Sequence, residues 1–521
     1  MKRLAAALIA TLLMVGYAEA VPAITIAQGA LKGGDEDGVF VYKGIPFAAP
    51  PVGPNRWRAP QNAPHWQGER DATAFGPVCP QAKIKAASFG DAKLPEAEDC
   101  LTLNVWTPDT GGKLPVMVWI HGGAFRIGGS ASPIYDGTDL AKHGVVIVSI
   151  NYRLGWLGYL AHPALESEAG SDPSGNYGLM DQIAALRWVR ANIAAFGGDP
   201  ANVTIFGESA GGMSVNDLMA SPLAHGLFAK AISESGLGLV PTQSLAKARA
   251  SGEALARRLG AEGDNATVLA KLRATDVEAL LNDQKDASES QSTAPFIDGK
   301  LLPGDVASAF ARGEIANAAY MAGSNSNEAT LIESLGVKED SFFEPFGDKL
   351  TLVRQLYEAD GKLSDKDFFH QVFNDSVFAS GAHGLAGFAA AKGQPSYVYN
   401  FRYLAERLRG FRDGVSHGGE LVYVFGLRGL ENGGGMGARL AKLATDNDHK
   451  MVDMVQTYWT NFAKTGDPNS EGLPEWPGFS LSTPRTLVFE DTTKAVSGFE
   501  ENKLTIYYTG WSARTGIAMP D

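Results

Sequence analysis

The chain has 521 residues, 45% of them hydrophobic and 20% charged, so it can bury a large core and lacks the composition of a disordered protein. Its formal net charge of -13 disfavours binding to a nucleic-acid backbone, which requires clustered Lys and Arg, and no such cluster stands out. Length and composition therefore predict a compact globular protein.

The first 20 residues have the pattern of an export signal. Lys2 and Arg3 precede an apolar run, and the tripeptide Ala-Glu-Ala at 18–20 supplies a cleavage site of small residues. The run is short for a membrane span, and no later segment reaches its length. We expect a signal peptide at residues 1–20, a periplasmic or extracellular mature protein, and no membrane anchor after cleavage.

The chain contains only two cysteines, Cys79 and Cys100. If they pair in an oxidising compartment, they close a loop of about 20 residues, which stabilises the fold by roughly 3 kcal/mol in the chain-entropy model. Two unpaired thiols are the alternative. Metal binding by this pair is disfavoured, because the sequence has no Cys-x-x-Cys motif and no Cys/His cluster.

Strand-like and helical segments alternate through the first half of the chain. Residues 114–123 and 145–153 are short, apolar and rich in β-branched residues, as buried strands of a mostly parallel sheet are. Residues 179–196 carry apolar side chains at helical spacing, and a third apolar run at 203–206 follows. This alternation predicts an α/β fold with a central, mostly parallel sheet flanked by helices.

The second half adds helical excursions to this scaffold. Residues 243–286 and 340–392 are rich in Ala, Leu and Glu, and they either cover a pocket or pack only for stability. Residues 397–403 and 486–491 are predicted to be late strands. Because nothing resembling a linker divides the mature chain, we predict a single domain over residues 21–521.

A Gly-x-Ser-x-Gly motif occurs twice, around Ser209 and around Ser416. A serine nucleophile needs a tight strand-to-helix turn with glycines on both sides. Ser209 follows the apolar run at 203–206 and precedes residues 210–220, which can be helical. Ser416 follows a charged segment without a strand, so Ser209 is the candidate nucleophile.

The serine needs a histidine base and a carboxylate that orients it, and in this fold class their chain order is Ser, acid, His. The best candidate base is His417, in a glycine-rich loop before an apolar segment. The other histidines after Ser209 are less suitable by position, and they are His225, His370, His383 and His449.

For the acid, Glu328 follows an apolar run that ends in polar loop residues, where a strand would open towards an active site. Asp298 is the rival, although an aspartate beside a glycine is common in simple turns. Gly122 and Gly123 follow another apolar strand. Their N–H groups, with that of Ala210, can form an oxyanion hole, unless this segment is a plain glycine-rich turn.

Several segments resemble those of the carboxylesterase type-B family of the α/β-hydrolase fold, and they occur in the same order along the chain. This family includes cholinesterases and liver-type carboxylesterases. The matching segments are YKGIPFAAPPVGPNRWRAPQ, EDCLTLNVWTP, PVMVWIHGGAF, NYGLMDQIAALRWVRANIAAFGGDPANVTIFGESAGG, VSHGGELVYVFG and YWTNFAKTGDPN. They span most of the mature chain. The resemblance implies an α/β-hydrolase fold with helical excursions that cover the active-site pocket.

The resemblance also implies roles for individual residues. The family nucleophile falls on Ser209, the histidine on His417 and the acid on Glu328. The oxyanion hole falls on Gly122, Gly123 and Ala210, and the early disulfide of the family falls on the pair Cys79 and Cys100, with its loop near the pocket mouth.

The implied activity is hydrolysis of a small-molecule carboxylic ester through an acyl-enzyme, with no cofactor and no metal. Amidase or narrow-specificity ester hydrolysis on the same triad is an alternative. A non-catalytic adhesion or scaffold protein is another, since this fold also occurs without catalysis. The sequence does not determine the oligomeric state.

Overall fold

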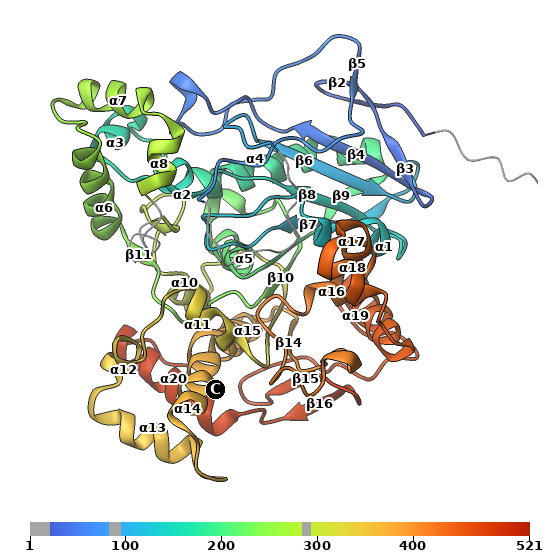
Figure 1. Ribbon diagram of the computed structural model, residues 1–521, viewed down its shortest axis with the longest axis vertical. Coiled ribbons are helices and arrows are strands. Elements are labelled where there is room, and N and C mark those ends of the chain that lie inside the picture. The colour runs from blue at the N-terminus through green and yellow to red at the C-terminus, as the bar shows by residue number, and fades with distance from the viewer. Residues whose placement is uncertain (1–20, 83–94, 284–292, 521) are drawn as a thin grey trace, which may run out of the picture.

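A large β-sheet forms the centre of the structure (Figure 1). The structure is a computed structural model that describes residues 21–82, 95–283 and 293–520, so the expected signal peptide at 1–20 lies outside the described residues. The strands of this sheet are, in chain order, β3 (Gly34–Glu36), β4 (Val39–Pro46), β6 (Thr102–Thr107), β7 (Leu114–Ile120), β8 (Val146–Ile150), β9 (Gly198–Glu208), β10 (Lys230–Glu234), β13 (Ala319–Asn325), β14 (Ser396–Phe401), β15 (Arg485–Phe489) and β16 (Lys494–Ser497).

The 11 strands lie in the spatial order β16-β15-β14-β13-β10-β9-β7-β8-β6-β4-β3. All neighbours from β8 to β15 pair in parallel, and the pairs at the two ends of the sheet are antiparallel. The inner strands are buried on both faces, which explains why β7 and β8 are nearly continuous apolar runs. The predicted mostly parallel central sheet is confirmed.

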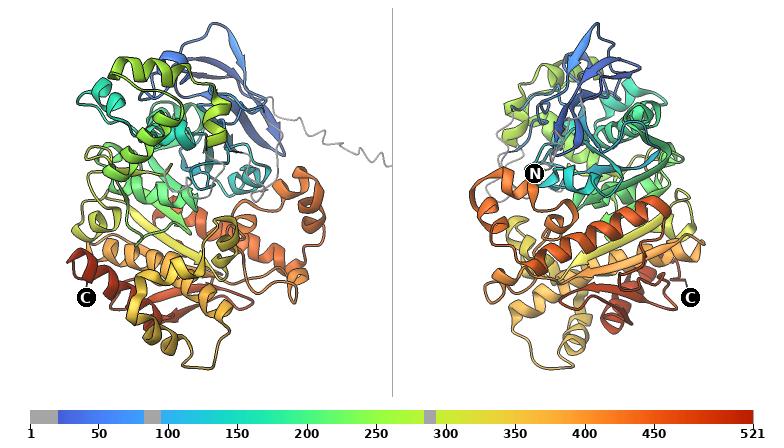
Figure 2. Two further views of the ribbon diagram at one scale, coloured as in Figure 1. Left: turned by 60° about the vertical axis from the view of Figure 1, so that its left-hand side comes forward. Right: turned by 90° about the vertical axis from the view of Figure 1, so that its right-hand side faces the viewer.

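Helices cover both faces of the sheet (Figure 2). Those used below are α2 (Gly155–Tyr159), α4 (Tyr177–Asn192), α5 (Ala210–Ala220), α11 (Leu331–Ser334), α14 (Asp365–Phe373), α15 (Ser380–Ala391), α16 (Leu421–Phe425), α19 (Asp446–Thr465) and α20 (Glu501–Thr515). The two predicted helical excursions are present and include α6 (Leu245–Arg258), α7 (Asn265–Ala274), α8 (Val277–Asp283), α12 (Glu339–Phe343) and α13 (Leu350–Tyr357).

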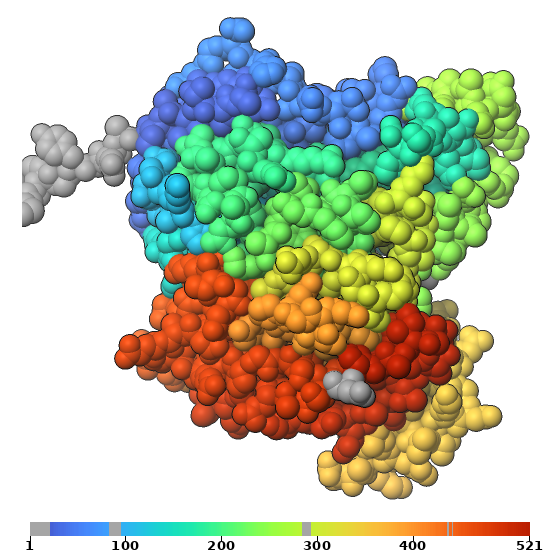
Figure 3. Space-filling view, turned by 180° about the vertical axis from the view of Figure 1, so that it is seen from behind, coloured from blue at the N-terminus to red at the C-terminus, as the bar shows by residue number. Residues whose placement is uncertain are grey.

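The earlier and the later part of the chain occupy opposite ends of the molecule (Figures 1 and 3). The N-terminal strands, drawn in blue, lie at one end, and α20 with the last strands, drawn in red, lies at the opposite end. The structure also contains two small sheets. One consists of β1 (Ile24–Ile26), β2 (Gly29–Lys32) and β5 (Glu69–Asp71). The other consists of β11 (Gln243–Ser244) and β12 (Phe296–Ile297).

A separate hydrophobic core lies on each face of the sheet. On one face, Phe206 and Ile232 of the central strands pack in the same cluster as Trp459 and Phe462 of α19. On the other face, the alternate residues of these strands belong to a larger cluster that includes Leu218 and other residues of α5. The alternation follows from the two-residue period of a strand.

The carboxyl ends of the parallel strands meet along one edge of the sheet, which is where ligands bind in open α/β folds. β7 runs into Gly122, β9 into Ser209, β10 into Ser235, and β13 into the loop that holds Glu328. The topology therefore brings segments far apart in the sequence to the same edge.

Candidate active site

Ser209 occupies a sharp turn between β9 and α5. Its backbone angles are φ 57° and ψ -121°, a conformation that is rare for a residue with a side chain and costs free energy. The turn is crowded on both sides. A Cβ on Gly211 would lie 2.0 Å from the carbonyl oxygen of Ile120, and a Cβ on Gly207 would lie 2.6 Å from the backbone of Gly211. Only glycine fits at these two positions, as a nucleophile turn requires.

His417 and Glu328 are in direct contact. Nδ1 of His417 lies 2.6 Å from Oε2 of Glu328, and both side chains are buried. The other oxygen of Glu328, Oε1, accepts hydrogen bonds from the backbone N–H of Asn325 and from the hydroxyl of Ser235, each at 2.6 Å. The carboxylate is therefore held on both oxygens and can fix the orientation of the imidazole.

The second ring nitrogen of His417 faces the turn that holds Ser209. Nε2 lies 3.0 Å from Oε1 of Glu208, the residue before Ser209, but neither of these two atoms makes a hydrogen bond. Burial disfavours the charged imidazole, yet the carboxylates of Glu208 and Glu328 outweigh burial and raise the pKa of His417 well above its ordinary value. The site thus stabilises an imidazolium.

Gly122 lies against the same turn. A Cβ on Gly122 would lie 2.7 Å from the carbonyl oxygen of Glu208 and 3.2 Å from Cβ of Ser209, so a larger residue would push the two segments apart. Gly123 has a φ of 107°, which favours glycine. Ala210 is the first residue of α5, and the first N–H groups of a helix have no partner within it.

The strand end before Gly122 is anchored by a buried aromatic pair. His121 stacks on Tyr152 with ring centroids 4.4 Å apart, and the Tyr152 hydroxyl donates to the carbonyl oxygen of His121 at 2.8 Å. Burial lowers the pKa of His121 to about 4, so this histidine is neutral at working pH. Nδ1 of His121 also lies 2.8 Å from the carbonyl oxygen of Gly122.

The side chains of the rival candidates contact groups other than His417 and Glu328. Ser416 is in a loop before α16, and its hydroxyl oxygen lies 3.4 Å from Nη1 of Arg412. Oδ1 of Asp298 accepts from three backbone N–H groups of its own turn. His370 is in α14, and His383 in α15 is held between the Ala379 carbonyl and Thr486.

Ser235 is a part of the site that the sequence reasoning missed. It follows β10 with a φ of 49°, and its hydroxyl donates to Glu328. No motif marks it, because its place depends on the pairing of β10 between β9 and β13. The only sequence signal is a serine directly after a strand-like segment that ends in Glu234.

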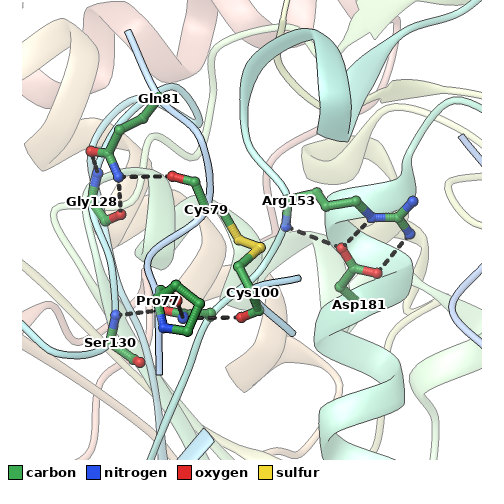
Figure 4. The surroundings of a disulfide bond; sticks show 9 residues. Pro77, Cys79, Gln81, Cys100, Gly128, Ser130, Arg153 and Asp181 are labelled. Atoms are coloured by element: carbon green, nitrogen blue, oxygen red, sulfur yellow. Dashed lines mark hydrogen bonds and ion pairs between the residues drawn. A yellow bond between two sulfur atoms is a disulfide. The ribbon is translucent and has the colours of Figure 1, made fainter. Parts of the chain in front are cut away.

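The disulfide joins Cys79 and Cys100, as expected (Figure 4). Gln81, two residues after Cys79, exchanges two hydrogen bonds of 2.9 Å with the backbone of Gly128, in the segment that follows the Gly122–Gly123 pair. The segment that follows Cys79 is therefore hydrogen-bonded to the loop after the candidate oxyanion hole. Residues 83–94 between the cysteines lie outside the described residues, so the expected place of this loop at a pocket mouth stays a prediction.

The described residues contain neither a candidate membrane span nor a candidate metal site. No helix in residues 21–82, 95–283 or 293–520 is long and apolar enough to cross a membrane. The same residues contain no group of three or more His, Cys, Asp or Glu arranged to hold a metal ion.

A serine on a sharp turn after a parallel strand, together with a buried His–carboxylate pair, is typical of an α/β-hydrolase. The model of the carboxylesterase family matches residues 20–507, and the chain belongs to this family. Among curated relatives, the chain is 39% identical to the para-nitrobenzyl esterase of Bacillus subtilis, covering 90% of this chain and 94% of that protein. It is 32% identical to liver carboxylesterase 1 of Oryctolagus cuniculus, covering 95% and 94%.

Solved structures agree with this relationship. A para-nitrobenzyl esterase structure superposes with a TM-score of 0.78 at 36% identity and covers 93% of this chain and 99% of that chain. A carboxylesterase of Geobacillus stearothermophilus gives a TM-score of 0.78 at 32% identity, with the same coverage. The predicted α/β-hydrolase fold is confirmed.

Proposed function

We propose that this carboxylesterase is a serine hydrolase that cleaves small-molecule carboxylic esters through an acyl-enzyme, with a triad of Ser209, His417 and Glu328. The observation that carries the proposal is the double contact of His417: Nδ1 meets Glu328, and Nε2 lies 3.0 Å from Glu208, directly before the nucleophile turn. This contact supports a base whose free nitrogen is beside Ser209 and whose other nitrogen is oriented by a carboxylate.

In the acylation step, Nε2 of His417 takes the hydroxyl proton of Ser209 as Oγ attacks the ester carbonyl carbon. The carbonyl oxygen becomes an oxyanion, and the backbone N–H groups of Gly122, Gly123 and Ala210 stabilise it. The bond to the alcohol oxygen then breaks, and the imidazolium returns its proton to the departing alcohol.

Deacylation repeats these events with water. His417 takes a proton from a water molecule, the hydroxide attacks the acyl carbon, and a second oxyanion forms in the same place. The bond between Oγ and the acyl carbon breaks, Ser209 regains its proton, and the carboxylic acid leaves. Glu328 orients the ring and stabilises the imidazolium.

We also propose that the protein works outside the cytoplasm as one catalytic domain over residues 21–521, after removal of residues 1–20. The export pattern of those residues and the disulfide between Cys79 and Cys100 support this location, because disulfides persist in oxidising compartments. N-terminal sequencing of the mature protein from its host tests the cleavage, and an intact N-terminus would contradict it.

The experiment that tests the esterase proposal is a burst assay with p-nitrophenyl esters from acetate to long acyl chains. Wild type should release one equivalent of p-nitrophenol before steady turnover, and Ser209→Ala should release none. Ser416→Ala is the matched control, since it removes the serine of the second Gly-x-Ser-x-Gly motif and should keep the burst. Full activity in Ser209→Ala would refute the nucleophile, and hydrolysis of anilides instead of esters would favour an amidase.

A further inference from the structure

A row of in-register residues crosses the sheet beside the candidate active site. Glu208 of β9 pairs with Glu234 of β10, which pairs with Gly323 of β13, which pairs with Tyr399 of β14. Residues paired in register on neighbouring parallel strands point to the same face of the sheet. The two carboxyl groups and the Tyr399 ring therefore share the face that α19 covers.

Gly323 gives the Tyr399 ring its place in this row. A Cβ on Gly323 would lie 2.3 Å from Cδ1 of Tyr399, so the ring lies across the glycine in the direction of β10. The Tyr399 hydroxyl is buried and has no hydrogen-bond partner. Burial raises the pKa of Tyr399 well above its ordinary value, and Glu234 is the largest contributor among the charged groups.

Glu234 is held in place by a hydrogen bond from helix α19. It is fully buried, and its Oε1 accepts a hydrogen bond of 2.8 Å from Nε1 of Trp459 in α19. Its second oxygen, Oε2, is buried without a hydrogen-bond partner, as are Oε1 of Glu208 and Oε1 of Glu420. Three buried carboxyl groups thus each keep one oxygen without a hydrogen bond, and neighbouring carboxylates cannot all be ionised at low cost.

Glu208 links this cluster to the base. Its Oε1 lies 3.0 Å from Nε2 of His417, and its charge also acts on Glu234. Glu208 therefore interacts both with Glu234 and with the nitrogen of His417 that exchanges a proton with Ser209 in the proposed mechanism.

We propose that Glu234 is a positioning residue for the ester hydrolysis proposed above: its buried carboxyl, fixed by Trp459, adjusts through Glu208 the negative charge that faces Nε2 of His417. The inference rests on the proposed function. Glu234 does not touch the reacting atoms, and it acts only through Glu208.

The charge of Glu234 changes within the working pH range. Burial, opposed by the Trp459 hydrogen bond and reinforced by Glu208, raises the pKa of Glu234 to about 8. Below that pH the carboxyl is neutral. Above it, the added negative charge favours the imidazolium that forms at His417 in the transition state, so kcat/KM rises in a second step on the order of threefold.

The two buried tyrosines that face the cluster do not explain such a step. Burial and the neighbouring carboxylates keep Tyr135 and Tyr399 protonated, because they raise the pKa of both phenols far above the ordinary value. Burial, followed by the charges of Glu208, Glu234 and Glu328, raises the pKa of Glu420 well above its ordinary value. Glu420 is therefore the group to which a step that survives the loss of Glu234 would be assigned.

The test compares pH profiles of kcat/KM for wild type, Glu234→Gln and a control variant, from about pH 6 to about pH 10. Glu234→Gln keeps the acceptor for Trp459 and removes the charge, so it should match wild type at neutral pH and lack the alkaline step. A structural role would instead lower activity by the same factor at every pH. Either that uniform loss or a surviving step in Glu234→Gln would overturn the proposal, and so would a wild-type profile without the step.

Asp217 provides the matched control. It is also a buried carboxyl with an unpaired oxygen, and burial raises its pKa to about 8. However, it belongs to α5, where its charge acts on Tyr159 of α2. Asp217→Asn should keep the alkaline step, and its loss in this variant would refute the assignment to Glu234.

A second variant, Glu234→Asp, keeps the proposal testable if Glu234→Gln does not fold. Glu234→Asp keeps a titrating carboxyl, so it should keep an alkaline step with a displaced midpoint, and a flat profile would overturn the proposal. Failure of the proposed function is distinguishable, because wild type would then hydrolyse no ester. Active enzymes with identical profiles refute only the role of Glu234.

Discussion

The hydrogen bonds around Glu328 predict a specific defect in Glu328→Gln. Oε1 of Glu328 accepts from two donors, Asn325 N–H and the Ser235 hydroxyl, so the amide oxygen of the glutamine must take that position. The amide NH2 group then faces Nδ1 of His417 at the place of the present 2.6 Å contact. Nδ1 becomes the acceptor, the ring proton moves to Nε2, and Nε2 can no longer take the Ser209 proton.

A wrong tautomer costs roughly 1,000- to 10,000-fold in kcat in enzymes with this constellation, which is about 4 to 5.5 kcal/mol of transition-state stabilisation. The assay is steady-state hydrolysis of a p-nitrophenyl ester, with a urea unfolding curve to show that the variant is folded. Glu333→Gln makes the same chemical change at an exposed position of the adjacent α11 and should have wild-type kcat. A folded Glu328→Gln enzyme that keeps more than about a tenth of the wild-type kcat would refute the reasoning.

Three further outcomes follow from the contacts. Gly211→Ala places a Cβ against a backbone carbonyl and should lower the free energy of unfolding by about 1–3 kcal/mol in urea titration; an unchanged midpoint would contradict the crowding. Replacing both Cys79 and Cys100 by alanine should lower it by about 3 kcal/mol, and a loss near zero would show that the disulfide does not stabilise the fold. Glu208→Gln removes a charge that raises the pKa of His417, so the imidazole stays in its neutral, basic form at more acidic pH. The acid limb of kcat/KM should therefore move to lower pH, and a shift to higher pH would reverse the assigned sign.

The local elements of the site were predictable from the sequence. The helix expected at residues 210–220 is α5, and the apolar runs around 114–123 and 145–153 contain β7 and β8. These elements have a strong apolar pattern and end at glycines or polar loops, so pattern and structure agree. The helix expected at 179–196 begins two residues earlier, at Tyr177, and its last turn is a 3-10 helix from Ile193 to Phe196.

The choice between rival residues needed the tertiary structure. Asp298 and Glu328 both stand in loop-like sequence, and only the packing of β13 beside β10 brings Glu328 to His417. The sequence could offer Asp298 as an alternative because a turn aspartate and an active-site acid have the same local pattern. In the structure, Asp298 satisfies the N–H groups of its own turn.

The cluster behind the triad could not be read from the sequence at all. Glu208 and Glu234 are 26 positions apart, with a helix between them, and their pairing depends on the parallel register of β9 and β10. Trp459 reaches Glu234 from α19, more than 200 residues later. Register and long-range packing are properties of the whole sheet, and no short motif encodes them.

The measurement that tests the central claim most directly is the mass of the enzyme trapped during turnover. An acid quench of the protein with a slowly deacylating ester, followed by proteolysis and mass spectrometry, locates the acyl group. The account predicts one acyl group per chain, on the peptide that contains Ser209 and on its hydroxyl. An acyl group on Ser416 or on any other side chain, or turnover of the ester without any covalent adduct, would contradict it.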